Sequence, residues 1–410
     1  MKTTPVRGTT DFLPEEAALR SAMQAVILET YETYGYNRVE TPILEDVENL
    51  DKSDGGENLN LIFKVLKRGE KLEKDLASGE ELADMGLRYD LTLPLVRYYA
   101  NNREKLGAPF KSIQVGPVFR AERPQKGRLR QFIQCDIDVL GDSSENMETE
   151  LIFVTAQALI KLGFTGFKIL VNDRRILKSL LMAFGFEKET LDSVCITFDK
   201  LDKVGPDGVQ QELGEKGMPE NAVSALISFL KEGDMSLNGV AERSGSDMAE
   251  RLARVIDKAN ELSGGQYEAV YAPNLVRGQG YYTGIVFEVQ VAGYPGSVGG
   301  GGRYDNMVEK FIGHSVPAVG FSIGFERVAQ ILLEQGRKIQ GQRPKMALLY
   351  DEAGSDFARV MECAKKLGEK YRISAIPKEK NRGKQFKKLD AQEFTGTIDF
   401  ETGEQKEFSR

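Results

Sequence analysis

The residues best suited to chemistry form a dense cationic cluster with one carboxylate inside it. The segment FRAERPQKGRLRQF, residues 119–132, holds Arg120, Glu122, Arg123, Lys126, Arg128 and Arg130. Guanidinium groups this close repel one another, so the cluster indicates an anionic ligand. Arginine suits phosphate because its planar fork donates two hydrogen bonds at once. A solvated basic hairpin is the alternative interpretation.

Two further segments place an arginine beside glycines. In GSVGGGGRYD, residues 296–305, four consecutive glycines allow a backbone to approach a ligand closely, and Arg303 follows them, although such runs are also common in loops. NLVRGQGYYTGIVFEV, residues 274–289, places Arg277 ahead of Tyr281 and Tyr282. Adjacent strand residues face opposite ways, which predicts that only one of these tyrosines lines a given pocket.

A fourth segment, GFSIGFERV at residues 320–328, predicts a strand that turns into a helix at Gly324. Arg327 then falls in the first helical turn, where the helix dipole disfavours a cation. We therefore expect Arg327 to reach outward to an anion.

Histidine and cysteine usage excludes several kinds of chemistry. The only histidine is His314, in a loop-like stretch, so an HExxH zinc site is excluded and a Ser-His-Asp triad would need this residue. Cys135, Cys195 and Cys363 lie far apart without a CxxC pair, which favours reduced core thiols. No GxxxxGK[ST] segment occurs. Catalysis therefore depends on Arg, Lys, carboxylates and amides.

Length and composition indicate a multidomain globular protein. The 410 residues suit about two to three domains, and 41% are hydrophobic. A net charge of -7 excludes a wholly basic nucleic-acid binder, so a polyanion must bind a local patch. The first residues lack an apolar signal region and no long apolar run occurs, which predicts a cytoplasmic protein without a membrane segment.

Hydrophobic periodicity predicts how these segments are positioned. Helices are expected at 15–34, 145–162 and 326–336, with a helical segment around YYANN. Strands are expected at 36–40, 61–66, 86–92, 111–122, 130–141, 167–173, 280–291 and 315–325. Short links between consecutive strands suggest antiparallel pairing, with the arginine cluster between two of them.

The same patterns predict a domain organisation. We expect a catalytic domain in two parts, 1–172 and 266–336, with a helical insertion subdomain at 173–265. A linker at 337–344 leads to a small α/β unit at 345–410, which opens with the strand MALLYD, a helix and the strand RISAIP.

Seven ordered segments between residues 7 and 328 resemble the motifs of histidyl-tRNA synthetases, a family of class II aminoacyl-tRNA synthetases. They are RGTTDFLPEE, LRYDLTLPLVRY, FRAERPQKGRLRQF, QCDIDVLG, LVRGQGYYTGIVFE, GGGRYD and GFSIGFERV. The resemblance implies an α+β fold: the class II antiparallel sheet flanked by helices, with the helical insertion and a small C-terminal α/β unit.

The resemblance also implies an activity. The family joins histidine to ATP, releases pyrophosphate and passes the histidyl group to the 3' end of tRNA(His). Arg120 would hold the α-phosphate, Glu122 the adenine side and Phe132 the base, with Arg128 and Arg327 on the outer phosphates. Arg277 matches the family's catalytic arginine, which bridges the histidine carboxylate and the α-phosphate. In-line attack by a carboxylate needs alignment and charge neutralisation only.

Histidine itself would be held by a second group of residues. The resemblance places the α-amino group at Asp90, Thr92 and Gln134, and it counts Leu91 and Arg120 among the histidine-binding residues. It places the imidazole at Asp138 and Tyr282, with Tyr281 beside them. A carboxylate and a hydroxyl can read the ring's donor and acceptor nitrogens. The family further implies Mg²⁺ bound with ATP and a homodimer, with RGTTDFLP on the dimer side.

The chain departs from the family at two places. Gln279 and Gly280 stand where the family often has Leu-Asp before the tyrosines. After residue 377 the sequence is shorter than the family's anticodon-binding domain, as though a central helix and strand were missing. Basic residues crowd into residues 365–388 there, and we hypothesise that they contact tRNA weakly, a solvated helix face being the alternative.

Two other functions fit parts of the sequence. One is the catalytically inactive, synthetase-like regulatory subunit of ATP phosphoribosyltransferase, which binds histidine and lacks the anticodon domain. Arg277, Arg327 and the arginine hairpin speak against it, since a histidine sensor needs no triphosphate site. The other is an adenylate-forming ligase that acts on a metabolite or protein instead of tRNA.

Overall fold

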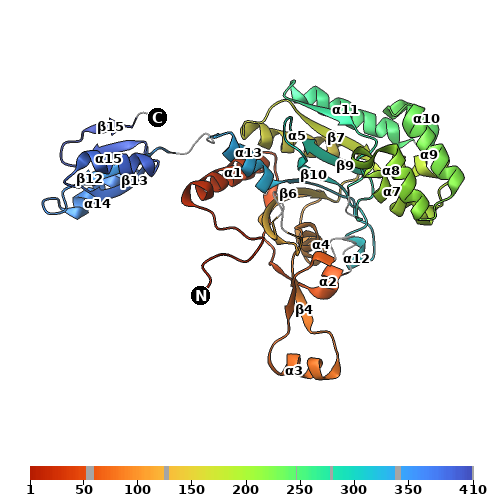
Figure 1. The fold of residues 1–410 in the computed structure, drawn as a ribbon, viewed down its shortest axis with the longest axis horizontal. Helices are drawn as coiled ribbons and strands as arrows, with labels where there is room; N and C mark the ends of the chain where they lie inside the picture. The colour runs from red at the N-terminus through yellow and green to blue at the C-terminus, as the bar shows by residue number, and fades with distance from the viewer. Residues whose placement is uncertain (52–59, 124–128, 246, 278–279, 338–342, 409–410) are drawn as a thin grey trace. The chain divides into compact units, whose positions relative to one another are not determined.

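The structure, a computed structural model, describes residues 1–51, 60–123, 129–245, 247–277, 280–337 and 343–408. The chain divides into two compact units, residues 1–337 and residues 338–410 (Figure 1). No helix among the described residues is long and apolar enough to span a membrane.

An eight-stranded sheet forms the centre of the first unit, in the order β1-β5-β6-β11-β10-β9-β7-β8. Its strands are β1 (Asn37–Arg38), β5 (Phe110–Phe119), β6 (Gln131–Leu140), β7 (Phe167–Asp173), β8 (Tyr267–Tyr271), β9 (Ile285–Gln290), β10 (Ser297–Arg303) and β11 (Ala318–Ile323). Pairing is antiparallel throughout the middle, as expected, and parallel at the edges, where β1 pairs with β5 and β7 with β8.

Helices flank this sheet, which confirms the α+β class II architecture. α1 (Pro14–Thr33) buries Leu19, Met23, Ile27 and Tyr31, one residue per turn, and packs against α5 (Asn146–Lys161). α13 (Phe325–Glu334) follows β11 directly and packs on β6. α4 (Thr92–Asn102), η2 (Arg103–Lys105) and α12 (Glu309–Ile312) complete this part of the unit.

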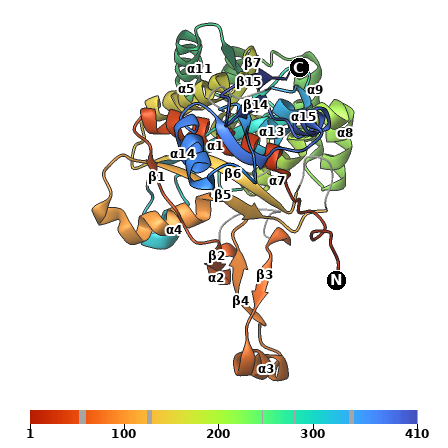
Figure 2. The ribbon, with the colours of Figure 1, turned by 90° about the vertical axis from the view of Figure 1, so that its left-hand side faces the viewer.

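A small three-stranded sheet forms an arm that carries a helix at its end (Figures 1 and 2). Its elements are β2 (Leu44–Asp46), α2 (Val47–Asp51), β3 (Lys64–Leu66), α3 (Gly69–Ser78) and β4 (Ala83–Leu87). The expected strand at 86–92 is therefore wrong beyond Leu87. After Leu87 the chain turns into α4, which begins at Thr92, and the Arg88 guanidinium donates to the carbonyl oxygens of Pro117 and Thr41.

Between β7 and β8 the chain is helical, as its periodicity indicates. The elements are α6 (Arg174–Ala183), η3 (Lys188–Thr190), α7 (Leu191–Phe198), α8 (Leu201–Glu215), α9 (Glu220–Glu232), α10 (Leu237–Ser244) and α11 (Met248–Ser263). α8 has a break at Gly205, whose φ of 68° lies in the left-handed region.

The second unit is a four-stranded sheet in the order β13-β12-β14-β15. Two separate hydrophobic cores pack against it, one on each face. It contains β12 (Lys345–Tyr350), α14 (Phe357–Leu367), β13 (Arg372–Pro377), α15 (Arg382–Ala391), β14 (Gly396–Asp399) and β15 (Gln405–Glu407). The first three were expected. α15, β14 and β15 were not among the elements expected from the sequence.

Candidate active site

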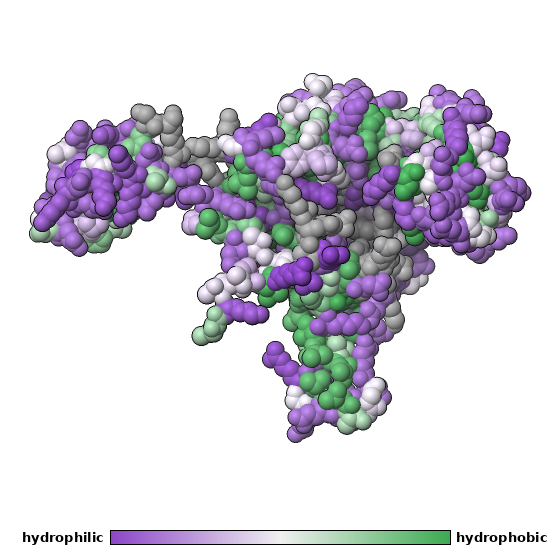
Figure 3. All heavy atoms as spheres, viewed as in Figure 1, coloured by the Kyte–Doolittle hydropathy of each residue, from purple (hydrophilic) through white to green (hydrophobic). Residues whose placement is uncertain are grey.

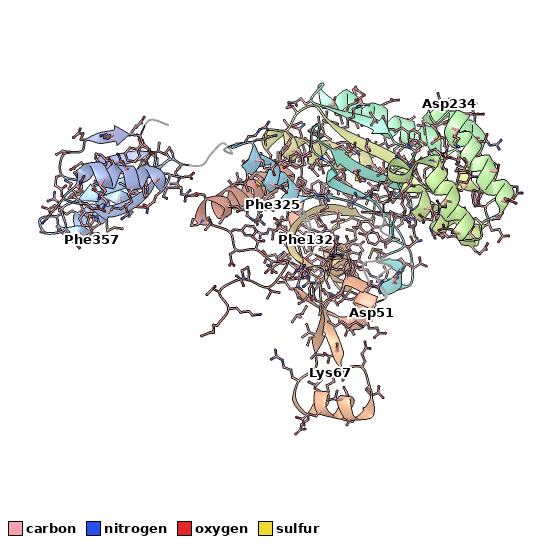
Figure 4. All side chains as sticks on the ribbon, viewed as in Figure 1. Asp51, Lys67, Phe132, Asp234, Phe325 and Phe357 are labelled. Carbon is pink, nitrogen blue, oxygen red and sulfur yellow. The ribbon has the colours of Figure 1, made fainter. Side chains whose placement is uncertain are left out.

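Most of the predicted site residues line one cleft of about 830 Å³ in the first unit. The cleft lies over the middle of the large sheet, and Figure 4 marks two of its lining residues, Phe132 and Phe325. The predicted residues in its lining are Thr92, Arg120, Glu122, Phe132, Gln134, Asp138, Arg277, Tyr281, Tyr282 and Arg327. Asp90 and Leu91 are buried outside this lining, and Arg128 lies outside the described residues.

Strand β6 supplies one wall through its two-residue repeat. Phe132, Gln134, Asp136 and Asp138 all line the cleft, since alternate side chains of a strand face one side. Cys135 between them is buried on the opposite side and is a free thiol, as expected. The sequence analysis missed Asp136, although the same alternation could have identified it.

Arg120 follows β5 and is fixed from two directions. Its Nε donates to the carbonyl oxygen of Tyr89 at 3.0 Å, and its guanidinium carbon lies 5.1 Å from the centre of the Phe132 ring. This cation–π contact holds the guanidinium beside the aromatic face. Arg120 and Phe132 thus form one joint surface in the cleft, suited to an anion next to a flat apolar group.

Asp138 has a partner that the sequence analysis did not name. The hydroxyl of Tyr304, just after β10, donates to Asp138 Oδ1 at 2.6 Å. Glycine is required opposite, because a Cβ on Gly320 would lie 1.9 Å from the same oxygen. Tyr304 stands in the GGGRYD segment, whose tyrosine was the available signal. Arg303, its neighbour, instead points away into a buried bidentate pair with Glu148.

Arg277 occupies a strained backbone position at the cleft. Its φ of 63° is left-handed, which costs a non-glycine residue roughly 1–2 kcal/mol. Its Nη1 lies 3.3 Å from Glu288 Oε2, and it also hydrogen-bonds with Tyr282. A Cβ on Gly300 would lie 2.3 Å from that Nη1. The glycine strand β10 thus makes room for this guanidinium.

Tyr281 and Tyr282 both line the cleft, so the expectation that only one would do so is wrong. That expectation assumed a strand from residue 280, but β9 begins at Ile285. Outside the strand, the two rings need not alternate. They lie in edge contact with centres 4.8 Å apart.

Arg327 lies in the first turn of α13, as predicted. Its guanidinium donates to the carbonyl oxygen of Ser297 and lines the cleft. The preceding residue, Glu326, is used differently: it forms a bidentate pair with Arg20 of α1 at 2.6 and 2.7 Å. Arg327 is therefore the cationic side chain that this helix presents to the cleft.

Burial dominates the electrostatics of the cleft's carboxyl groups. Burial raises the pKa of Asp90 to about 6, against the hydrogen bond from the Leu93 N–H, which lowers it. Burial also raises the pKa of Asp138 to about 7, against the hydrogen bond from Tyr304. The pKa of Asp136 is raised well above its usual range by burial and then by neighbouring Asp138. A cationic ligand nearby would stabilise the ionised form of these carboxyl groups.

The arrangement brings two complementary groups of charges together. Arg120, Arg277 and Arg327 can bind an anion, while Asp90, Asp136 and Asp138 can bind a cation close by. Among the described residues, no three or more His, Cys, Asp or Glu side chains form a group that could hold a metal ion. His314 is exposed and does not line the cleft. The site suits a zwitterionic ligand next to a polyanion.

Comparisons with known proteins agree on one family. The family model described as "Histidyl-tRNA synthetase" matches residues 8–328. A "Histidine--tRNA ligase" of Leifsonia xyli subsp. xyli is 44% identical over 349 residues, which cover 80% of each chain. The crystal structure of a histidyl-tRNA synthetase from Nostoc sp. PCC 7120 matches with a TM-score of 0.80 and 25% identity, over all of this chain and 97% of that one.

A further solved structure shares the fold. It is described as an ATP phosphoribosyltransferase regulatory subunit/histidyl-tRNA synthetase from Bacillus halodurans C. The TM-score is 0.76 at 19% identity, over 97% of this chain and 98% of that one. At this identity the likeness concerns the fold alone.

Proposed function

The chain belongs to the histidyl-tRNA synthetase family, and from that premise we infer that it is a histidine–tRNA ligase. It activates histidine with ATP to histidyl-adenylate and transfers the histidyl group to the 3' end of tRNA(His). The observation that carries this conclusion is the meeting of three arginines and the buried carboxyl groups in one cleft. A zwitterionic amino acid and a triphosphate are the ligands that such a site accepts together.

The arginines serve the phosphates. Arg120 holds the α-phosphate and Arg327 the outer phosphates, to which the resemblance also assigns Arg128, a residue outside the described ones. Phe132 stacks on the adenine and Glu122 lies at its edge. Arg277 is the catalytic residue: it contacts both the histidine carboxylate and the α-phosphate and neutralises charge as they approach. Electrostatic stabilisation of this kind needs no protein nucleophile.

The carboxyl groups serve the amino acid. Asp90 and Gln134 receive the α-ammonium group, with Leu91 and Thr92 forming that end of the pocket. Asp138, held by Tyr304, accepts from one imidazole nitrogen, and Tyr282 reads the other with Tyr281 beside it. An apolar amino acid would leave these buried polar groups unpaired, which is the basis of its rejection.

Mg²⁺ enters with ATP. Its main ligands would be the phosphate oxygens, because among the described residues no three or more His, Cys, Asp or Glu side chains form a group that could hold a metal ion. The metal would supply neutralisation of phosphate charge.

The regulatory-subunit alternative is less well supported. A histidine sensor would need the carboxyl end of the cleft only. Arg120 and Arg327 at its other end have a use only when a nucleotide binds as well.

We propose that the homodimer implied by the resemblance forms through the arm. Leu44, Leu66, Leu76 and Met85 of β2, β3, α3 and β4 are between 39% and 66% exposed, and Figure 3 shows hydrophobic side chains gathered along the arm. A second copy of the chain is the occupant of this surface, with RGTTDFLP on the same interface. We expect Leu66→Asp with Leu76→Asp to give monomers in sedimentation analysis. A dimer that survives both changes would move the interface elsewhere.

The enzyme works in the cytoplasm.

The second unit contacts tRNA through its basic side chains. Lys384, Lys387 and Lys388 of α15 are exposed, although Lys388 also lies 3.6 Å from a carboxylate oxygen of Glu379, and Lys378 is paired with Asp399. We expect charge reversal of the three exposed lysines to weaken tRNA charging and flatten its salt dependence, because each phosphate contact releases counterions. Pyrophosphate exchange, which involves no tRNA, serves as the control. Unchanged charging and salt dependence would contradict the assignment.

The function is tested by histidine-dependent exchange of labelled pyrophosphate into ATP. The wild-type protein should exchange with histidine and with none of the other amino acids. Arg277→Ala should abolish exchange, while calorimetry should still detect histidine binding, weakened by the loss of the contact with its carboxylate. Histidine binding without exchange in the wild type would contradict the proposed function and favour the regulatory subunit.

A further inference from the structure

Three buried oxygen atoms at the cleft have no hydrogen-bond donor among the described residues. They are Asp90 Oδ2, Gln134 Oε1 and Asp136 Oδ1. Asp90 is 1% exposed and Asp136 5%. Gln134 and Asp136 point to the same side of β6 and line the cleft, and Asp90 is close enough to Asp136 for their charges to interact. Two of the three acceptors therefore line the cleft, and the third is buried beside it.

Acceptors buried without donors are costly, so such a group indicates a ligand that donates. An ammonium group has three N–H donors and no acceptor, which matches three unpaired oxygens. Other oxygens nearby are already used. The Thr92 hydroxyl is hydrogen-bonded with Tyr281, Asp138 Oδ1 accepts from Tyr304, and Asp136 is also hydrogen-bonded with Ser322.

We propose that Asp136 is an additional substrate-binding residue, whose Oδ1 accepts the third N–H of the α-ammonium group beside Asp90 and Gln134. This rests on the proposed function, because it assumes histidine as the ligand. Along β6 the assignment gives a consistent order: Phe132 at the nucleotide, Gln134 and Asp136 at the ammonium, Asp138 at the imidazole. Asp136 thereby distinguishes an amino acid from a molecule that carries only the ring and the carboxylate.

Charge supports the same assignment. Asp136 faces two other carboxyl groups, Asp90 and Asp138, while Arg120 is the cation that acts on it. Burial and these neighbours raise the pKa of Asp136, so the group favours its protonated form until a cation arrives. An ammonium group provides that cation and converts Asp136 into an ionised acceptor.

The test compares histidine with imidazole propionate, which is histidine without its amino group, by calorimetry on the full chain. Asp136→Asn keeps the shape and removes the charge, so we expect it to weaken histidine binding about tenfold, the usual difference between a charged and a neutral hydrogen bond. Binding of imidazole propionate should change less than about twofold. The matched control is Asp138→Asn, two residues along the same strand face, which should weaken both ligands alike.

Equal weakening of both ligands by Asp136→Asn, or no effect on histidine, overturns the inference. Thermal unfolding checks that the variant folds. If it does not, Asp136→Ser is put through the same comparison under the same criteria. Wild-type pyrophosphate exchange separates the two claims: exchange with histidine but an indifferent Asp136 refutes this inference alone, whereas a wild type that neither exchanges nor binds histidine refutes both.

Discussion

The same substitution at two neighbouring glycines of β10 should affect different quantities: catalysis at Gly300 and folding stability at Gly301. A Cβ on Gly300 would lie 2.3 Å from Arg277 Nη1 and 2.6 Å from its Cζ, which are the far end of a flexible side chain. A Cβ on Gly301 would lie 2.0 Å from the backbone oxygen of Gly320 and 2.7 Å from the Cα of Phe321. Gly300→Ala must therefore displace the guanidinium, whereas Gly301→Ala must push two strands apart.

The size of the effect follows from the geometry. An ordinary contact needs Arg277 to move by about 1 Å, and a misplacement of this size costs roughly 100-fold in rate, or about 2.7 kcal/mol in the barrier. We expect Gly300→Ala to lower pyrophosphate exchange by that factor at saturating histidine. Its free energy of unfolding should stay within about 1 kcal/mol of the wild type. Gly301→Ala should lose about 3 kcal/mol or more.

Urea unfolding and pyrophosphate exchange measure the two quantities separately. The control is Gly214→Ala in α8, where a Cβ meets nothing within 4 Å. It should keep the exchange rate and gain up to about 1 kcal/mol of stability. A Gly300→Ala variant with the wild-type exchange rate would refute the role of Arg277's position. If that variant unfolds as easily as Gly301→Ala, the placement of the two glycines is wrong.

Three further changes test the site and its support. Tyr304→Phe removes the donor to Asp138 and should raise the Kd of histidine about tenfold, with the KM for ATP unchanged; an equal effect on both ligands would contradict the assignment. Asp138 keeps its proton to about pH 7 when folded but only to about 3.8 when unfolded, so its stabilisation is complete below pH 3.8 and disappears as the pH rises through 7. Asp138→Asn should therefore flatten the loss of stability between about pH 4 and 7 in urea unfolding, and an unchanged slope would show that another group titrates. Glu148→Ala leaves Arg303 buried without that carboxylate and should cost about 3–5 kcal/mol, while Asp207→Ala, which breaks an exposed pair with Lys231, should cost less than about 1 kcal/mol; similar losses would disprove the importance of burial.

Local patterns in the sequence predicted most of the central sheet and its flanking helices. α1, α5, β5, β6 and β11 lie within a few residues of the expected ranges, because each has a clear apolar repeat. β10 was not predicted, since a run of glycines has no such repeat and disfavours strands when considered alone. Its place in the sheet depends on its neighbours: the glycines fit where Arg277 and the backbone of β11 come close.

The sequence motifs predicted most residues of the cleft, but they did not predict contacts of residues that no motif assigns to the site. Arg120, Arg277 and Arg327 converge as expected. The strand alternation could have placed Asp136 in the cleft, but its unpaired oxygen is seen only in three dimensions, and the Tyr304 contact joins residues 166 positions apart. Tyr281 and Tyr282 were assigned to a strand from β-rich composition, but their backbone lies before β9 begins.

Charging of total tRNA with labelled histidine tests the central claim most directly. The wild-type protein should attach histidine to the 3' end of one tRNA species, in a reaction that requires ATP and is lost in Arg277→Ala. Formation of histidyl-adenylate without any charged tRNA would contradict the account and identify a ligase that acts on another acceptor.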